Sequence, residues 1–184
     1  RNTVRKAISE LKHEGLVYKI QGRGTFVSSP KISHRFVTVV SFTEELLARG
    51  IRPSSKLLSL EIKKADEQVA EKLAISVGDP YYSIRRLRLG DGKPLGVNLS
   101  RIPVSLCPEL GKYDLTKGSL YSLIEDKYDQ KIMKVVRIME TIPADDEIAE
   151  MLGIRKGFPI LNIIGIAYNQ NKVPLDFCIE HYID

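Results

Sequence analysis

The sequence lacks the features that mark membrane, secreted and metal-binding proteins. No apolar run approaches the roughly 18 residues that a membrane-spanning helix needs. The N-terminus shows no succession of charged stretch, apolar stretch and cleavage site. Cys107 and Cys178 have no metal-ligand spacing, which favours buried thiols in a reducing compartment. We therefore expect a cytoplasmic protein with no membrane segment and no bound metal.

Patterns typical of catalysis and of cofactor binding are also scarce. His13, His34 and His181 stand apart from any Asp and Ser, or Cys, arrangement that would indicate a nucleophilic site. The acidic pairs at 44–45 and 145–146 fall at expected helix starts, where carboxylates favour the helix dipole. No glycine-rich phosphate loop is present. The sequence predicts no catalytic residues and no cofactor.

Positive charge is concentrated at one end of the chain. The net charge is +5. Residues 1–29 hold six basic and two acidic residues, and therefore carry +4 of it. The other 155 residues carry only +1. A compact basic module beside a near-neutral body is typical of a polyanion reader joined to a second function.

The basic segment has the pattern of a helix followed by a hairpin. Apolar residues recur at the i, i+3, i+4, i+7 spacing of an amphipathic helix, at Val4, Ala7, Ile8 and Leu11. Gly15 is placed to end that helix. Residues 16–20 and 25–27 predict short strands, and 21–24 predict a tight turn with a basic tip. Such a helix can enter a DNA major groove; an ordinary solvated basic face is the alternative.

The rest of the chain contains an internal repeat. Ala65–Pro80 aligns without gaps on Ala144–Pro159, with eight of sixteen positions identical. Each copy predicts a helix capped by Asp66 or Asp145, then a turn and a strand. Two copies are too few for a solenoid, so we expect one pseudo-symmetric domain.

Strand patterns surround both copies of the repeat. Strands are expected before the two helices, at residues 55–63 and 132–142. Hairpin turns are expected after the strands that follow the helices, at residues 90–93 and 169–172. A strand near Arg35 and a short helix with Ser41 or Thr43 as N-cap precede them. The predicted fold class is α+β, with a mainly antiparallel sheet flanked by helices. A cleft between the two halves is the expected place for a ligand.

The N-terminal motifs resemble a known family. Residues 1–8 (RNTVRKAI), 14–16 (EGL) and 21–27 (QGRGTFV) are similar to the recognition helix and wing of GntR-family winged-helix regulators. The resemblance implies DNA contacts by Arg1, Asn2, Thr3, Arg5, Arg23 and Gly24. The first two helices of that DNA-binding domain have no counterpart here, so we expect further residues before Arg1 in the natural protein.

Residues 35–184 resemble the UTRA effector domain of the HutC-type branch of that family. The motifs that carry the resemblance are residues 86–88 (RLR), 91–94 (DGKP), 119–121 (SLY), Pro174, Asp176 and Tyr182. It implies the chorismate-lyase fold and a cleft for a small anionic or sugar-derived metabolite. The effector-binding residues implied are Arg86, Arg88, Asn98, Ser100, Ser119, Tyr121, Asp176 and Tyr182.

The chemistry of these residues suits such a ligand. Arg86 offers a planar fork for phosphate or carboxylate. Ser119 and Tyr121 can add hydroxyl donors, and Ser119 would also open a helix whose free N–H groups favour an anion. Asp176 can accept hydrogen bonds from ligand hydroxyls or an amide, and Tyr182 can cover the cleft.

Two positions depart from the family pattern. Asn98 stands where relatives often have glutamate, so a charged acceptor becomes a neutral amide that donates and accepts. Arg101 stands where an aromatic residue is common. Both departures predict an effector different from the amino-sugar phosphates that the resemblance implies for several relatives.

We therefore expect three segments: 1–28, the C-terminal part of a winged-helix domain; 29–35, a linker; and 36–184, a UTRA domain. The predicted function is ligand-responsive transcriptional regulation, as a repressor, with a homodimer on operator DNA. A chorismate-lyase-like enzyme, and a DNA-binding protein whose C-terminal domain only dimerises, are the alternatives. The arginine-rich strand (Arg85, Arg86, Arg88) favours a ligand site over pure dimerisation.

Overall fold

The structure is a computed structural model that describes residues 2–13, 17–20, 24–27 and 41–183. The chain divides into two compact units, Arg1–Ile32 and Ser33–Asp184. The strand expected near Arg35, the cap at Gly15 and the linker lie outside the described residues.

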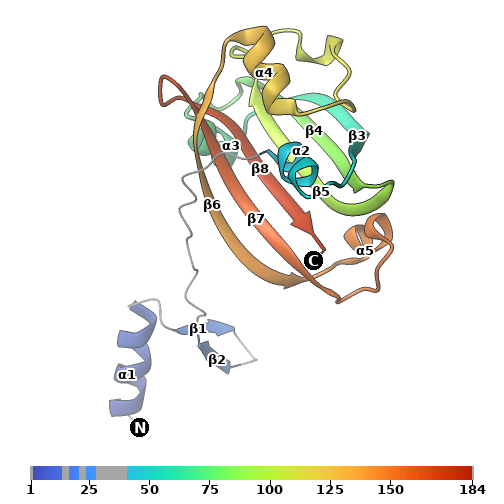
Figure 1. Cartoon of the computed structure of the whole chain (residues 1–184). Coiled ribbons are helices and arrows are strands. Elements are labelled where there is room, and N and C mark those ends of the chain that lie inside the picture. The colour runs from blue at the N-terminus through green and yellow to red at the C-terminus, as the bar shows by residue number, and fades with distance from the viewer. Residues whose placement is uncertain (1, 14–16, 21–23, 28–40, 184) are drawn as a thin grey trace. The chain divides into compact units, whose positions relative to one another are not determined.

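The first unit contains one helix and one hairpin (Figure 1). Helix α1 spans Asn2–His13, and strands β1 (Val17–Ile20) and β2 (Gly24–Val27) pair antiparallel. The helix and the hairpin predicted from the sequence are confirmed. The apolar stripe of α1 is exposed to solvent, at Val4, Ile8 and Leu11.

The second unit is built on a six-stranded sheet (Figure 1). Its elements are α2 (Phe42–Ala48), β3 (Pro53–Lys64), α3 (Glu67–Leu73), β4 (Pro80–Gly90), β5 (Lys93–Pro103), the 3₁₀ turn η1 (Leu110–Lys112), α4 (Leu120–Tyr128), β6 (Ile132–Pro143), α5 (Asp146–Leu152), β7 (Pro159–Asn169) and β8 (Pro174–Tyr182). The strand order is β3-β4-β5-β8-β7-β6, and every neighbouring pair is antiparallel. The α+β architecture predicted from the sequence is confirmed.

The strand order gives the repeat its structural meaning. The first half (β3-α3-β4-β5) and the second half (β6-α5-β7-β8) meet at the β5–β8 pair, in the centre of the sheet. Helix α3 packs against β8, and α5 packs against β5. Each repeat helix therefore covers a strand of the other half, which holds the two halves together as one domain.

The two faces of the sheet carry different helices. On one face, Val69 and Leu73 of α3 pack with Phe177, and Leu152 of α5 packs with Leu87. The opposite face is covered by α2 and α4. There, Ile84 and Ile102 of the sheet form a core with Leu120, Ile124 and the buried thiol Cys107. This second face carries the polar pocket described below.

Side-chain caps fix the starts of the short helices. Asp66 accepts from Val69 N and Asp145 accepts from Ile148 N, each at 2.8 Å. The capping side chain of α2 is Ser41 rather than Thr43, in a reciprocal capping box with Glu44. Each such cap contributes about 1 kcal/mol of stability. No helix within the described ranges is both long and apolar enough to span a membrane.

Candidate functional site

The central strands place a row of polar side chains on one face of the sheet. Because side chains alternate between faces, residues two apart in a strand point the same way. The register sets Arg86 of β4 opposite Asn98 of β5, and Asn98 opposite Glu180 of β8. Ser100 and Asp176 lie further along the same face of β5 and β8. A cation of the first half, Arg86, thus lies near two carboxyl groups of the second half, Asp176 and Glu180, at the centre of the domain.

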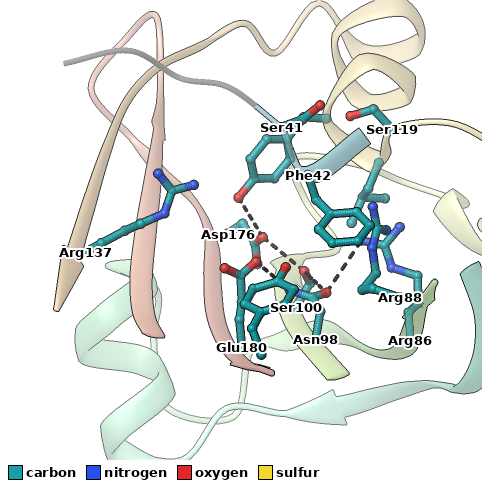
Figure 2. A pocket seen from close by; sticks show the side chains of 13 residues that line it. Ser41, Phe42, Arg86, Arg88, Asn98, Ser100, Ser119, Arg137, Asp176 and Glu180 are labelled. Atoms are coloured by element: carbon teal, nitrogen blue, oxygen red, sulfur yellow. Dashed lines mark hydrogen bonds between the residues drawn. The ribbon is translucent and has the colours of Figure 1, made fainter. Parts of the chain in front are cut away.

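These side chains line a pocket between the sheet, α2 and α4 (Figure 2). The empty space among these side chains, with the open mouth included, is about 420 Å³. The structure brings together all eight residues proposed from the sequence: Arg86, Arg88, Asn98, Ser100, Ser119, Tyr121, Asp176 and Tyr182. The lining also includes five residues that were not predicted from the sequence as ligand-binding: Ser41, Phe42, Leu120, Arg137 and Glu180.

Asp176 is the organising acceptor at the floor of the pocket. Its Oδ2 accepts from Tyr121 OH at 3.0 Å, and its Oδ1 accepts from Arg101 N at 3.1 Å. The Ser100 hydroxyl lies 3.1 Å from Asp176 Oδ2 and 3.2 Å from Asn98 Oδ1; with one proton, it donates to one of them at a time. Burial raises the pKa of Asp176 to about 6, although these hydrogen bonds oppose the shift.

Asn98 connects the first half to the second. Its Nδ2 donates to Glu180 Oε1 at 3.0 Å, and its Oδ1 lies 3.5 Å from Arg86 Nη2. The amide therefore uses its donor on a carboxylate and its acceptor toward a guanidinium, which a second carboxylate in its place could not do. Burial raises the pKa of Glu180, while the charges of Arg137 and Arg88 oppose that shift.

Arg86 and Arg88 are buried and short of hydrogen-bond acceptors. Within the described part of the chain, Arg86 Nε and Arg88 Nε and Nη1 have no partner. Burial and the charge of Arg88 lower the pKa of Arg86 to about 10, and burial also lowers that of Arg88. Buried donors are nearly always paired in folded proteins. The arrangement is therefore suited to an anionic group that accepts several N–H bonds.

Helix α2 covers the arginine end of the pocket. The Phe42 ring lies 4.4 Å from the Arg88 guanidinium carbon and stacks on Tyr182 at a centroid distance of 5.6 Å. Thr43 Oγ1 accepts from Arg88 Nη2 and donates to the Gly118 carbonyl oxygen, both at 3.3 Å. These contacts tie α2 both to the pocket and to the segment that opens α4.

Ser119 is the N-cap of α4, as expected from the sequence. Its side chain accepts from Ser122 N at 3.3 Å, and the first turn contains no acidic residue. Ser119, Leu120 and Tyr121 all line the pocket. The positive end of the helix dipole therefore faces the pocket. The Tyr121 hydroxyl is already used as a donor to Asp176.

Two arginines that entered the sequence argument do not line the pocket. Arg85 points to the opposite face of the sheet, where it pairs with Glu147 of α5 at 2.5 Å. The Arg101 guanidinium lies over Phe177, 4.7 Å from the ring centroid, on the α3 side. Strand alternation explains both positions, since neighbouring residues point to opposite faces. The departure at Arg101 therefore says nothing direct about the ligand.

Two of the missed residues carry charge, and the sequence held a signal for only one of them. Glu180 lies four residues after Asp176 in β8, so strand periodicity would have placed it on the same face. Arg137 comes from the edge strand β6 and reaches the pocket across β7. The sequence alone does not show that Gly165 of β7 leaves space for that crossing.

The basic module is a second candidate site. Of its expected DNA-contact residues, Asn2, Thr3 and Arg5 lie in the first turns of α1, and Gly24 begins β2. Arg1 and Arg23 lie outside the described residues. No group of three or more His, Cys, Asp or Glu residues suited to a metal occurs among the side chains that the structure describes.

A known domain family covers most of the chain. Residues 48–183 match the UTRA domain. The chain is 37% identical over 194 residues to the HTH-type transcriptional repressor NagR of Bacillus subtilis, covering 100% of this chain and 79% of that protein.

Solved structures agree with this match. The fold is similar to the crystal structure of PhnF from Mycobacterium smegmatis, with TM-score 0.75 and 28% identity over 98% of this chain and 79% of that one. It is also similar to a GntR-family transcriptional regulator from Enterococcus faecalis, with TM-score 0.65 and 29% identity over 70% of this chain and 92% of that one.

The fold and the pocket define an effector-binding domain, which follows a basic helix and hairpin in the chain. The chain belongs to the UTRA-domain transcriptional regulators of the GntR family. It is a ligand-responsive transcriptional regulator, and the relatives it resembles are named as regulators rather than as enzymes.

Proposed function

We propose that the chain represses transcription until a small phosphate- or carboxylate-bearing metabolite, such as a sugar phosphate, occupies the pocket. The observation that carries this proposal is the pair Arg86 and Arg88, which line the pocket and have buried N–H groups without a partner in the described part of the chain. Such donors destabilise the empty protein, and an anion that accepts from them recovers that energy on binding. The site thus couples ligand binding to protein stability.

The remaining lining suits a polyhydroxylated ligand. Ser100, Asn98 and Asp176 form a connected set of donors and acceptors next to the arginines, and ligand hydroxyl groups can exchange into such a set. The Phe42 and Tyr182 rings give the pocket an apolar wall. A phosphate held at the arginines with a sugar ring against this wall uses both features.

The DNA-binding role rests on α1 and the hairpin. We propose that two subunits form a homodimer, in which each places one α1 helix in a half-site of a palindromic operator. Asn2, Thr3 and Arg5 of α1 contact DNA in this proposal, together with Arg1, Arg23 and Gly24.

Helix α2 is the proposed link between ligand and DNA. Residues 28–40 join the basic module to Ser41 and Phe42, which line the pocket at the start of α2. Thr43 of the same helix bonds Arg88. An anion that draws Arg88 toward itself competes for this bond and changes the position of α2. The ligand then shifts the DNA-binding equilibrium by its difference in affinity for the two arrangements.

Thermal unfolding of the chain with a ligand panel tests the pocket. The panel contains inorganic phosphate, glucose 6-phosphate, glucosamine 6-phosphate, glucose and gluconate. A ligand at about 100 times its Kd adds about 2.7 kcal/mol of stability. Arg86→Ala should abolish the shift. Arg85→Ala is the matched control, because the side chain of Arg85 points to the opposite face and pairs with Glu147.

Either of two results would count against the proposal. One is a ligand shift that survives Arg86→Ala, which would locate binding elsewhere. The other is the absence of any shift with phosphates and carboxylates alike, which would leave the arginines without an anionic role.

A further inference from the structure

The pocket has a second cationic group at the end away from Arg86 and Arg88. Arg137 lines it from β6, and Figure 2 shows its guanidinium on the other side of Asp176 and Glu180 from the other two arginines. Arg137 also lines a larger groove beside the pocket, which shares Phe42, Glu180 and Tyr182 with it. Arg137 therefore stands where the pocket opens into this groove.

The fold makes specific room for Arg137. Gly165 of β7 pairs with Arg137 of β6 on one side and with Cys178 of β8 on the other. A Cβ at position 165 would lie 2.9 Å from Cys178 Sγ and 3.5 Å from Arg137 Cγ. The stem of Arg137 thus crosses β7 over a residue without a side chain. Any larger residue at position 165 would crowd this path toward the pocket.

No described residue neutralises Arg137 by direct contact. No hydrogen bond or ion pair joins it to any side chain that the structure describes, Glu180 included. Glu180 is close enough for the charge of Arg137 to lower its pKa, yet its carboxylate bonds Asn98 instead. Burial keeps the pKa values of Glu180 and Asp176 above their usual range.

We infer that Arg137 forms a second anion subsite, so that the effector carries two acidic groups: a phosphate at Arg86 and Arg88, and a carboxylate or second phosphate at Arg137. This inference rests on the proposed function, because it assumes that the first anion binds at the Arg86 end. It narrows the ligand class from sugar phosphates in general to phosphorylated sugar acids and similar two-headed anions. A sugar phosphate without a second acidic group occupies only the subsite at Arg86 and Arg88.

Calorimetric titration with matched ligand pairs tests the second subsite. Each pair consists of a phosphorylated acid and its phosphorylated alcohol: 6-phosphogluconate with glucitol 6-phosphate, 4-phosphoerythronate with erythritol 4-phosphate, and 3-phosphoglycerate with glycerol 3-phosphate. Three chain lengths are used because the spacing between the two subsites selects one of them. We expect the acid of at least one pair to bind about tenfold more tightly than its alcohol, as one added charge-assisted hydrogen bond provides.

Variants then assign the gain to Arg137. Arg137→Gln should remove the advantage of the acid and leave the affinity for the alcohol unchanged. Lys134→Gln is the matched control: Lys134 is another cation of β6, exposed and 5.6 Å from the Tyr168 ring centroid, and its loss should preserve the advantage. Thermal unfolding of each variant without ligand confirms that it is folded.

The outcomes separate this inference from the proposed function. Equal affinities of acid and alcohol in all three pairs would overturn the second subsite while leaving the first intact. Equal weakening of both members by Arg137→Gln would also overturn it, because it would assign Arg137 a structural role. Failure of every phosphate to bind would overturn the proposed function, and the second subsite with it.

Discussion

The two halves of the effector domain share a scaffold but differ at the positions that face the pocket. The repeat aligns Arg86 with Gly165 and Arg88 with Ala167. On the inner strands, the first half therefore supplies two buried cations where the second half has almost no side chain. The second half supplies its acids from β8 and its cation from the edge strand, over the space that Gly165 leaves. The same fold thus places the proposed anion site in the first half, and in the second half it leaves room at Gly165 for the Arg137 side chain.

This difference separates what holds the domain together from what it binds. The caps at Asp66 and Asp145, the helix packing and the sheet register are common to both halves. The binding chemistry is confined to a few side chains that break the symmetry. Substitutions at shared positions should therefore alter stability in both halves alike, whereas substitutions at unshared positions should act on one site.

The largest effect is expected from Asp176→Ala. Asp176 is 1% exposed and accepts from Tyr121, Ser100 and the backbone of Arg101. Its removal leaves several buried donors unpaired, at about 1–3 kcal/mol each. We expect urea denaturation to show a loss of roughly 4 kcal/mol, and a smaller loss for Asp176→Asn, whose amide oxygen still accepts. Equal losses for the two variants would contradict this role.

The pH dependence of stability provides the second test. The folded-state pKa of Asp176, about 6, lies above the unfolded value near 3.8, so the folded state binds the proton more tightly. Its stabilising contribution is complete below pH 4 and is lost as the pH rises through 6, by roughly 3 kcal/mol. The stability of the wild type relative to Asp176→Asn should fall accordingly between pH 4 and 7. Parallel pH profiles would show that Asp176 does not titrate in this range.

Arg86→Met should stabilise the empty domain. The buried guanidinium has a lowered pKa, and its Nε has no partner among the described residues. Replacing poorly compensated buried charge with an apolar side chain is often stabilising by about 1–4 kcal/mol. Removing this charge makes position 86 more similar to the equivalent position of the second half, which is the uncharged Gly165. The unfolding temperature without ligand should rise while phosphate binding disappears. A lower unfolding temperature would mean that Arg86 is fully compensated without ligand.

The smallest effect is expected at the positions that the halves share. Asp66→Ala and Asp145→Ala each remove one N-cap bond of 2.8 Å, so each should cost about 1 kcal/mol. The double variant should lose the sum to within about 0.5 kcal/mol, because the two caps share no partner. Losses that differ by more than about 1 kcal/mol would show that the scaffold is less symmetric than the repeat implies.

The sequence was sufficient to predict the scaffold. The repeat, the caps and the hairpin turns predicted the strands and helices of both halves, because short-range patterns determine these elements. The resemblance to UTRA domains supplied eight residues that the structure brings into one pocket. Arg85 and Arg101 pair with Glu147 and Phe177 outside the pocket, as strand alternation would have predicted.

The rest of the site depends on contacts between distant segments. Arg137 reaches the pocket only because β6 and β8 lie on either side of β7, with Gly165 at the crossing point. Phe42 and Ser41 line the pocket because the start of α2 lies over Arg88 of β4. Sequence periodicity reports which face a residue occupies but not which distant side chain it meets, so these contributions required the three-dimensional arrangement.

The most direct test of the account is the affinity of the full-length protein for its effector with and without saturating operator DNA. The ligand panel identifies the effector, and selection from random DNA identifies the operator. If the ligand controls DNA binding, operator should weaken effector binding about 5- to 150-fold, and effector should weaken operator binding by the same factor, because coupling is reciprocal. Equal effector affinities in the presence and absence of operator would contradict ligand control of DNA binding.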